Sequence, residues 1–243
     1  MKVELNKNII HFKEVNSTNE TARKYLKENK LQDDFVITAD FQSSGKGQLL
    51  NSWNSEPGKN LLISMVINVD IKLKNQFYLN IVSSLSVLDV LEKYNFKNSS
   101  IKWPNDILIN KKKVGGILIQ NFVKHDIIRQ TIIGLGLNIN QTDFTNYNRK
   151  ATSFCLESNS SYSVKEIRDE FLKKITKRLS MSEEENSDDY FSSLYLKDKA
   201  STFEVDNSIK MGIIRSVSKE GFLVVEFEDS TEKFKLQEIK YLS

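Results

Sequence analysis

The sequence predicts an α+β protein in which a large mixed body is followed by a small all-β tail. Apolar residues recur at helical spacing in 76–94 and 162–179, whereas 61–69 is a nearly continuous apolar run typical of a strand buried on both faces. From about residue 200 the pattern changes to short strands separated by turns. We therefore expect one domain at 1–198 and a second at 199–243.

Each element of the body follows from spacing and from start signals. Strands are expected at 9–15, 35–41, 61–69, 107–110, 114–123 and 127–140. A helix is expected to begin at Ser17-Thr18-Asn19-Glu20, where hydroxyls can cap the first turn. Further helices are expected at 76–94, at 162–179 with Ser163 as its cap, and at 190–196 after an acidic run. Four short strands, at 203–205, 209–217, 222–227 and 232–236, would form a small barrel-like tail.

Composition narrows the class of protein. The 243 residues carry 35 basic and 32 acidic side chains, interspersed along the chain, which is too balanced for a general nucleic-acid binder. The single cysteine, Cys155, excludes an intramolecular disulfide, fits a reducing compartment and is expected to be a small core residue. No apolar signal core opens the chain and no apolar run reaches transmembrane length. We expect a cytoplasmic protein with no DNA or membrane partner.

Glycine and proline usage points to a functional region at about 40–140, which holds seven of the nine glycines and both prolines. Gly45-Lys46-Gly47 follows a predicted strand, so backbone N–H groups and an ammonium could converge on an anion there. The segment is not a Walker A loop. Taken alone, a plain surface turn remains an open alternative.

A second segment combines cations, an aromatic ring, an amide and a carboxylate in Lys102-Trp103-Pro104-Asn105-Asp106, with Lys113 before Gly115-Gly116. Asn105 and Asp106 could orient an amine nucleophile, and Lys113 could neutralise charge that develops on a carboxylate or phosphate. The alternative is an edge strand broken by proline, with 111–113 as a solvated hairpin tip. We prefer that alternative for Lys111 and Lys112 but not for Lys113.

A third segment, Gly134-Leu135-Gly136-Leu137-Asn138, ends a predicted strand. Its glycines permit close approach of a ligand, and Asn138 could hold a phosphate or ribose, although the segment is not a dinucleotide fingerprint. His11 and His125 have no ligand-spaced partners, and no nucleophile elbow occurs. The chemistry left is substrate activation by phosphate electrostatics.

Taken in this order, the segments resemble the biotin–protein ligase family (biotin–[acetyl-CoA-carboxylase] ligase). The matching segments are Ser17-Thr18-Asn19; Gln42 with Gly45-Lys46-Gly47 and Trp53; Lys102 to Asp106 with Lys113 and Gly115-Gly116-Ile117-Leu118; and Gly134 to Asn138. The resemblance implies a class II synthetase-like mixed sheet with helices packed on one side, followed by an SH3-like barrel.

The resemblance also implies a two-step reaction that uses biotin, ATP and Mg²⁺. Biotin and ATP would give biotinyl-5′-AMP, and a lysine of a biotin carboxyl carrier domain would then take the biotin as an amide. The residues implied in catalysis are Lys113, Asp106 and Lys46. Those implied in biotin binding are Ser17, Thr18, Asn19, Gln42, Lys46, Gly47, Gln48, Lys113, Gly115 and Gly116. Those implied in nucleotide binding are Gly45, Trp53, Asn105 and Asn138. Mg²⁺ would be held mainly by the phosphates, and a monomer or weak homodimer is expected.

Two departures from the family pattern matter. The family loop often reads Gly-Arg-Gly-Arg-Arg-Gly-Arg, whereas here Lys46 is the only cation and Gln48 stands at a later arginine position. Since lysine lacks the bidentate phosphate geometry of arginine, we hypothesise weaker retention of the adenylate. Asn16-Ser17-Thr18 also lies close to the start, which leaves no room for a winged helix, so operator binding is not expected.

Three other functions stay open. Lipoate–protein ligase shares the fold and the adenylate strategy, but its Arg-Arg-x-Ser-Gly-Gly-Gly pattern is missing. An octanoyltransferase would need a different context around Cys155. A degenerate, non-catalytic biotin-binding protein is the alternative outside enzymes, because fold does not fix function.

Overall fold

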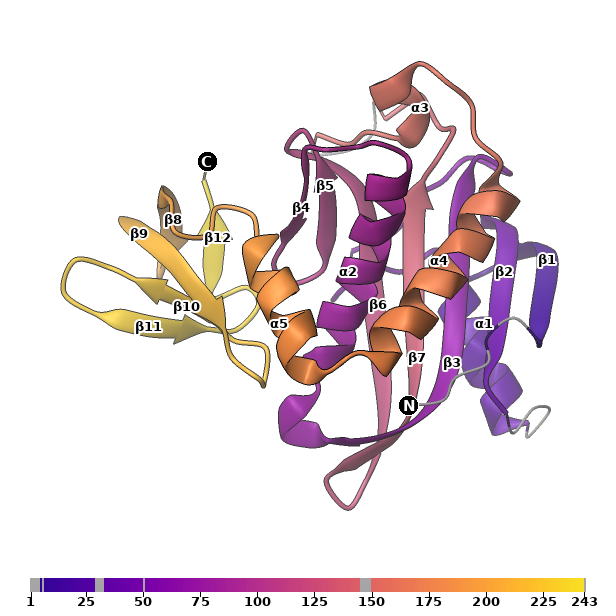
Figure 1. The fold of residues 1–243 in the computed structure, drawn as a ribbon, viewed down its shortest axis with the longest axis horizontal. Coiled ribbons are helices and arrows are strands. Elements are labelled where there is room, and N and C mark those ends of the chain that lie inside the picture. The colour runs from indigo at the N-terminus through magenta and orange to yellow at the C-terminus, as the bar shows by residue number, and fades with distance from the viewer. Residues whose placement is uncertain (1–4, 6, 29–32, 50, 145–149, 243) are drawn as a thin grey trace.

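The computed structural model describes residue 5 and residues 7–28, 33–49, 51–144 and 150–242 of the chain, and it confirms the α+β prediction (Figure 1). Seven strands form one sheet in the order β1-β2-β3-β7-β6-β5-β4. Their bounds are β1 (Ile9–Val15), β2 (Phe35–Gln42), β3 (Asn60–Lys72), β4 (Ser99–Lys102), β5 (Asp106–Ile109), β6 (Lys112–Lys124) and β7 (Ile127–Asn138). Because β1 runs parallel to β2 while the other neighbours are antiparallel, the predicted mixed sheet is confirmed.

Among the described residues, five α-helices and one short 3₁₀ helix accompany these strands. They are α1 (Thr18–Lys27), η1 (Leu73–Asn75), α2 (Tyr78–Lys93), α3 (Phe154–Ser158), α4 (Val164–Ser180) and α5 (Glu183–Ser192). Ser163 caps α4 as predicted, since its side chain accepts a hydrogen bond from the Glu166 N–H. The helix predicted at 190–196 begins earlier in the structure, as α5. The acidic run forms its first turn, where Ser182 and Glu185 make a capping box, and 193–196 lies beyond its end.

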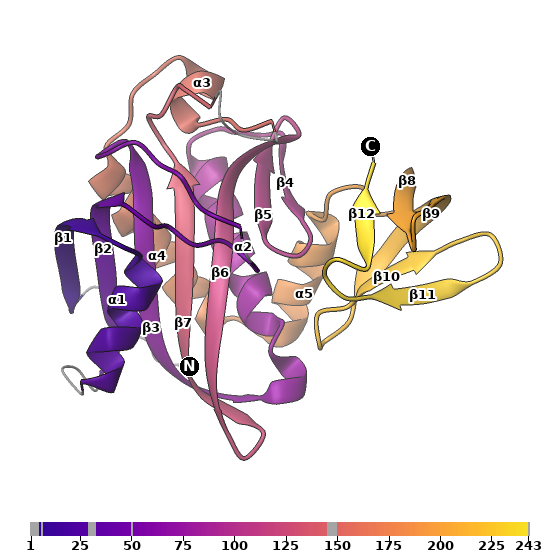
Figure 2. The same ribbon diagram turned by 180° about the vertical axis from the view of Figure 1, so that it is seen from behind.

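The helices cover both faces of the large sheet, so the one-sided packing expected from the resemblance is wrong for α1. Ile133 and Leu135 of β7 belong to a large apolar cluster with Ile175 of α4. Ile132, the residue before Ile133 in β7, belongs to a separate cluster with Ala22 of α1. Side chains of a strand alternate between faces, which places α1 opposite α2 and α4. Figures 1 and 2 show the two coverings from opposite sides. The sheet surface beneath α1 is called the α1 face below.

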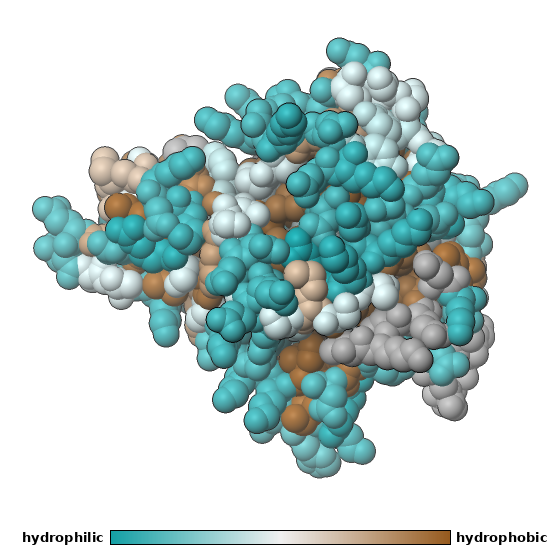
Figure 3. Space-filling view, viewed as in Figure 1, coloured by the Kyte–Doolittle hydropathy of each residue, from teal (hydrophilic) through white to brown (hydrophobic). Residues whose placement is uncertain are grey.

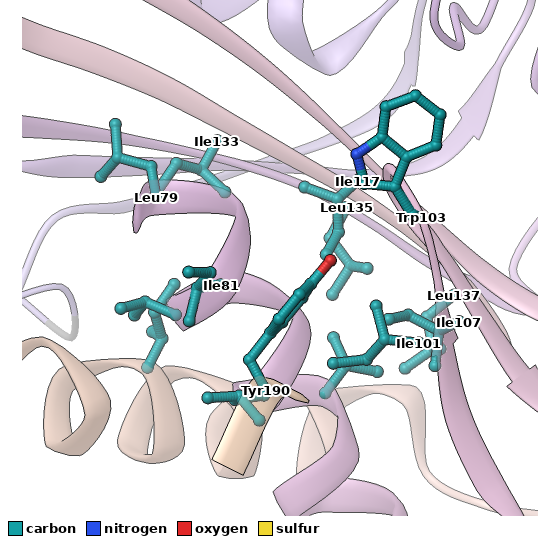
Figure 4. Packing of buried hydrophobic residues seen from close by; sticks show 14 of the residues in the cluster. Leu79, Ile81, Ile101, Trp103, Ile107, Ile117, Ile133, Leu135, Leu137 and Tyr190 are labelled. Atoms are coloured by element: carbon teal, nitrogen blue, oxygen red, sulfur yellow. The ribbon is translucent and has the colours of Figure 1, made fainter. Parts of the chain in front are cut away.

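The larger cluster explains why β3 reads as a continuous apolar run. β3 lies between β2 and β7 and is covered on both faces, so 60–67 is buried throughout. Figure 4 shows β6 and β7 side chains meeting α2 and Tyr190 of α5 in this cluster. Polar side chains dominate the outer surface over α2, α4 and α5 (Figure 3). No helix among the described residues is long and apolar enough to cross a membrane.

A second, five-stranded sheet follows α5 and lies to one side of the large sheet (Figure 2). Its order is β11-β10-β9-β8-β12, from β8 (Ala200–Val205), β9 (Ser208–Val217), β10 (Leu223–Glu226), β11 (Thr231–Phe234) and β12 (Ile239–Tyr241). Four of these strands were predicted, whereas β12, like β4 and α3, is too short to show a period. The pairing leaves β11 and β12 at open ends, so the SH3-like barrel stays a proposal.

The second sheet contacts the 102–106 segment. Trp103 Nε1 donates a hydrogen bond to the Gly221 carbonyl at 3.0 Å, and Lys102 Nζ lies 4.5 Å from the centre of the Tyr241 ring. Burial raises the pKa of Tyr241. Trp103 is only 4% exposed and packs in the large cluster, so it does not supply the ligand-facing aromatic plane that its sequence context suggested. The indole joins the two sheets instead.

Candidate functional site

A strip of bare backbone on the α1 face forms the floor of the candidate site. Ile132, Gly134 and Gly136 are spaced two residues apart on β7. They therefore share one face of the sheet, the face that packs against α1. Gly116 of β6 pairs directly with Gly136, and Leu118 pairs with Gly134. A Cβ at Gly136 would lie 2.4 Å from Trp53 Cε2, which no side chain can tolerate. These glycines are therefore required where another group lies flat on the sheet.

A buried polar cluster occupies the same face at the start of α1. The side-chain amide oxygen of Gln42, Oε1, accepts hydrogen bonds from the Thr18 N–H at 2.7 Å and from the Thr18 hydroxyl at 3.0 Å. Gln42 thus provides a hydrogen-bond acceptor for a backbone N–H in the first turn of α1. Ser17 stands at the N-cap position, but its side chain makes no capping hydrogen bond, contrary to the sequence expectation. Asn19 donates to the Leu118 carbonyl at 3.3 Å. The cluster therefore bridges α1, β2 and β6.

Ser64 completes this cluster and was missed by the sequence prediction. It lies on β3 opposite Gly134, is fully buried, and its Oγ lies 2.7 Å from Thr18 Oγ1 and 2.5 Å from Asn19 Oδ1. A Cβ at Gly134 would lie 2.2 Å from Asn19 Oδ1. The only sequence signal was that Ser64 interrupts an apolar strand. A buried hydroxyl needs a hydrogen-bond partner, so such a serine indicates a polar contact.

Lys113 stands at one end of the glycine floor. Its Nζ lies 2.5 Å from Asp106 Oδ1 and 5.7 Å from the centre of the Trp53 ring. The position of a Cβ at Gly116 would be 3.3 Å from the same ammonium. The Lys113 side chain is 27% exposed and that of Asp106 is 10% exposed. A cation is thus held over bare backbone, with one face still open to an incoming anion.

Two buried polar atoms near this floor have no partner among the described residues. They are Trp53 Nε1, a donor, and Asn138 Oδ1, an acceptor. Asn138 follows Gly136 on the α1 face, and its Nδ2 donates to the Thr152 carbonyl at 3.0 Å. Buried groups of this kind carry a free-energy penalty unless something pairs with them. Both residues were predicted to contact a nucleotide.

Asn105, another residue predicted to contact the nucleotide, makes a hydrogen bond within the sheet. Its Nδ2 donates to the Ile117 carbonyl at 2.6 Å, and the Ile117 N–H donates to the Asn105 carbonyl at 3.1 Å. This pair extends the contact between β5 and β6 beyond Gly116. Gly115 packs against the opposite face, since a Cβ there would lie 2.9 Å from Leu137 Cδ1. These two residues shape β6 around Lys113.

The Gly45-Lys46-Gly47 loop is brought to the site, although its cation points elsewhere. A Cβ at Gly45 would lie 2.3 Å from the Trp53 carbonyl oxygen and 2.9 Å from Gln42 Nε2, so this glycine permits the loop to close. Lys46 forms an ion pair with Glu20 of α1. The Gly47 N–H donates to the Asn51 carbonyl at 2.8 Å.

Gln48 lies apart from the polar cluster. It lines a hollow of about 280 Å³ together with Trp103, Ile119 and residues of the second sheet. Cys155, expected in the core, is half-buried in α3. Among the described residues no group of three or more His, Cys, Asp or Glu side chains gathers into a metal cage.

Known proteins share both sequence and fold with this chain. The model of the biotin/lipoate A/B protein ligase family matches residues 11–138. The bifunctional ligase/repressor BirA of Bacillus subtilis is 34% identical over 137 residues, which are 56% of this chain and 42% of that protein. The biotin–[acetyl-CoA-carboxylase] ligase of Mycobacterium tuberculosis is 27% identical over 113 residues, covering 45% of this chain and 41% of that protein. The chain thus spans less than half the length of either relative.

One solved structure is similar along nearly the whole chain. Biotin protein ligase from Aquifex aeolicus, in complex with biotin and ATP, has a TM-score of 0.78 and 27% sequence identity. The similarity covers 96% of this chain and 98% of that one.

Proposed function

Since this chain belongs to the biotin/lipoate A/B protein ligase family, we propose that it is a biotin–protein ligase that joins biotin to a lysine of a carboxyl carrier domain. The observation that carries the proposal is the glycine floor on the α1 face, with Lys113 at one end and buried amides and hydroxyls at the other. The bicyclic ring of biotin needs an apolar slot with a few polar anchors, and its carboxylate needs a cation. The similar Aquifex ligase was solved with biotin and ATP.

In the proposed first step, an oxygen of the biotin carboxylate attacks the α-phosphorus of ATP. A P–O bond forms, the bond to the leaving pyrophosphate breaks, and biotinyl-5′-AMP results. Two anions must approach each other, and the Lys113 ammonium offsets their repulsion. The anchors for the ring are Ser17, Thr18, Asn19 and Gln42. Trp53 and Asn138 contact the nucleotide, which gives their unpaired buried atoms partners.

In the second step, the amine of the carrier lysine attacks the carbonyl carbon of the mixed anhydride. A C–N bond forms, the C–O bond to AMP breaks, and the amine loses a proton. Asp106, whose carboxylate lies beside the Lys113 ammonium, orients this amine and accepts the proton that the amine loses. Mg²⁺ enters with ATP, bound to the phosphates. We also propose that 1–198 is the catalytic domain and 199–243 an SH3-like domain.

The loop departure supports a further part of the proposal. Its one cation, Lys46, pairs with Glu20 rather than with a group on the glycine floor. Closing over a phosphate would require Lys46 to leave that carboxylate. We therefore retain the hypothesis that biotinyl-AMP escapes faster here than from an arginine-rich relative, which a dissociation half-time of equal length would contradict.

A biotin-dependent ATP–pyrophosphate exchange assay tests the function. The full chain is expected to exchange label only when biotin is present, and to place biotin on a carrier lysine in a second assay. The family also includes lipoate ligases, so lipoate is the matched competitor. Faster exchange with lipoate than with biotin would move the assignment to lipoate–protein ligase. Biotin binding without exchange would indicate a non-catalytic binder.

A further inference from the structure

The buried carboxylate of Glu157 in α3 joins two parts of the chain that are distant in sequence. Its side chain is 7% exposed. It accepts hydrogen bonds from Thr152 Oγ1 at 2.5 Å, Asn110 Nδ2 at 2.6 Å and Lys112 Nζ at 3.2 Å. Asn110 lies in the turn between β5 and β6, and Lys112 is the first residue of β6. Lys112 is exposed at this hairpin tip, as predicted, and its ammonium also contacts Glu157.

Both parts lead directly to Lys113. The Lys113 N–H donates to the Lys150 carbonyl at 2.9 Å, and the Thr152 N–H donates to the Lys113 carbonyl at 2.8 Å. Lys112 is its neighbour in the chain. The carbonyl of Thr152 also accepts from Asn138, one of the proposed nucleotide contacts. The backbone on each side of Lys113 is thus tied to residues that Glu157 holds.

The chemistry of Glu157 suits a clamp rather than a reacting group. A buried charge is tolerated when it is paired and hydrogen-bonded. Burial raises the pKa of the Glu157 carboxyl, but hydrogen bonds from Thr152, Asn110 and Lys112 outweigh burial, and the pKa is lowered. The carboxylate is therefore ionised at neutral pH and accepts hydrogen bonds from Asn110 and Lys112 in this charged form. α3 has five residues, too few to hold itself in place without such contacts.

We propose that Glu157 is a positioning residue for Lys113 in the ligase reaction, an inference that rests on the function proposed above. By fixing the backbone at 112–113 against 150–152, Glu157 holds the flexible lysine side chain over the glycine floor beside Asp106. The biotin-ring anchors lie on α1, β2 and β3 and do not touch this clamp. Loss of the clamp therefore affects turnover more than biotin binding.

The primary variants are Glu157→Gln and Thr152→Val in the full chain. Glutamine keeps one acceptor oxygen but loses the charge, and valine keeps the shape of threonine but removes the donor. Because small misplacements of a catalytic group are costly, each variant is expected to lower kcat for exchange by about tenfold or more. The KM for biotin is expected to rise less than kcat falls, because the anchors for the ring on α1, β2 and β3 are unchanged. The double variant should be no slower than the slower single one, since both remove the same contact.

Glu170→Gln is the matched control. Glu170 is also a poorly exposed carboxylate, with a side chain 11% exposed, and it pairs with Lys93 at 2.5 Å between α4 and α2 rather than with a residue of the Lys113 clamp. This control separates lost stability from lost positioning. Equal loss of kcat in Glu170→Gln and Glu157→Gln, or no loss in Glu157→Gln, would overturn the proposal.

A second readout does not depend on ligase activity. An amine reagent followed by mass spectrometry reports how accessible the Lys113 ammonium is. Labelling of Lys113 is expected to be faster in Glu157→Gln than in the wild type, and unchanged in Glu170→Gln. Absence of biotin-dependent exchange in the wild type would defeat the proposed function alone. Unchanged labelling in Glu157→Gln would defeat the clamp, whether or not the wild type is active.

Discussion

Replacing Lys113 by alanine removes the cation on which the proposed chemistry depends. At an effective dielectric constant near 20, an ammonium about 3 Å from a phosphate oxygen interacts with it by about 5–6 kcal/mol. Water reaches part of Lys113, whose side chain is 27% exposed, so the net contribution is smaller. Removal of one such transition-state donor typically costs about 3–4 kcal/mol, a factor of ~10²–10³ in rate.

The assay is biotin-dependent ATP–pyrophosphate exchange, and a fall of at least ~10² is expected for Lys113→Ala. The fold should persist, with some loss of Tm because the Asp106 carboxylate, 10% exposed, loses its partner. Lys113→Arg keeps that ion pair and should preserve Tm while restoring only part of the rate. Lys124→Ala, an exposed lysine at the other end of β6, is the control. An exchange rate for Lys113→Ala equal to that of Lys124→Ala would refute the role.

Three further outcomes are expected. Gly136→Ala would place a Cβ 2.4 Å from Trp53, so the indole must move; nucleotide binding measured by calorimetry should weaken by about tenfold, and unchanged affinity would show that the floor tolerates a side chain. Ser64→Ala removes a buried donor worth about 1–3 kcal/mol, so the KM for biotin should rise while Tm falls no more than in the equally buried Ser83→Ala; an unchanged KM would exclude Ser64 from the polar cluster's function. The lowered pKa of Glu157 contributes stability above its unfolded value of 4.5, and this is lost as pH falls through the folded value. The difference in Tm between wild type and Glu157→Gln should therefore shrink below pH 4.5, and a constant difference would count against an ionised clamp.

Local patterns predicted most elements of this fold, because their periods are long enough to read. The continuous apolar run of β3 and the helical spacing of α2 and α4 correspond to the structure within a few residues. The elements β4, β12 and α3, of three to five residues, were missed since they contain no more than about two periods of their pattern. The two-sided covering by helices was also missed, because the order of strands in a sheet is set by long-range pairing.

The segments that form the candidate site were visible in the sequence, because glycines, a lysine and polar residues interrupt apolar strands there. Which contacts each residue of these segments makes was not visible in the sequence. Trp103 and Asp106 are three residues apart, yet one binds the second sheet and the other holds Lys113. Lys46 and Gln48 are two residues apart, yet one pairs with α1 and the other lines a separate hollow. Sequence spacing does not specify which side of a turn faces the site.

The sequence by itself determined which residue types make up the candidate site, since types and spacing are fixed in the chain. They are glycines in a strand, one lysine near them, and hydroxyls and amides at a helix start. Only the tertiary structure decided that Ser64 and Glu157 serve those residues. Each reaches its partners from a separate strand or helix, across 45 residues or more from Ser64 to Asn19 and from Glu157 to Lys112. A hydrogen bond of that kind depends on how the sheet closes, and no local pattern records it.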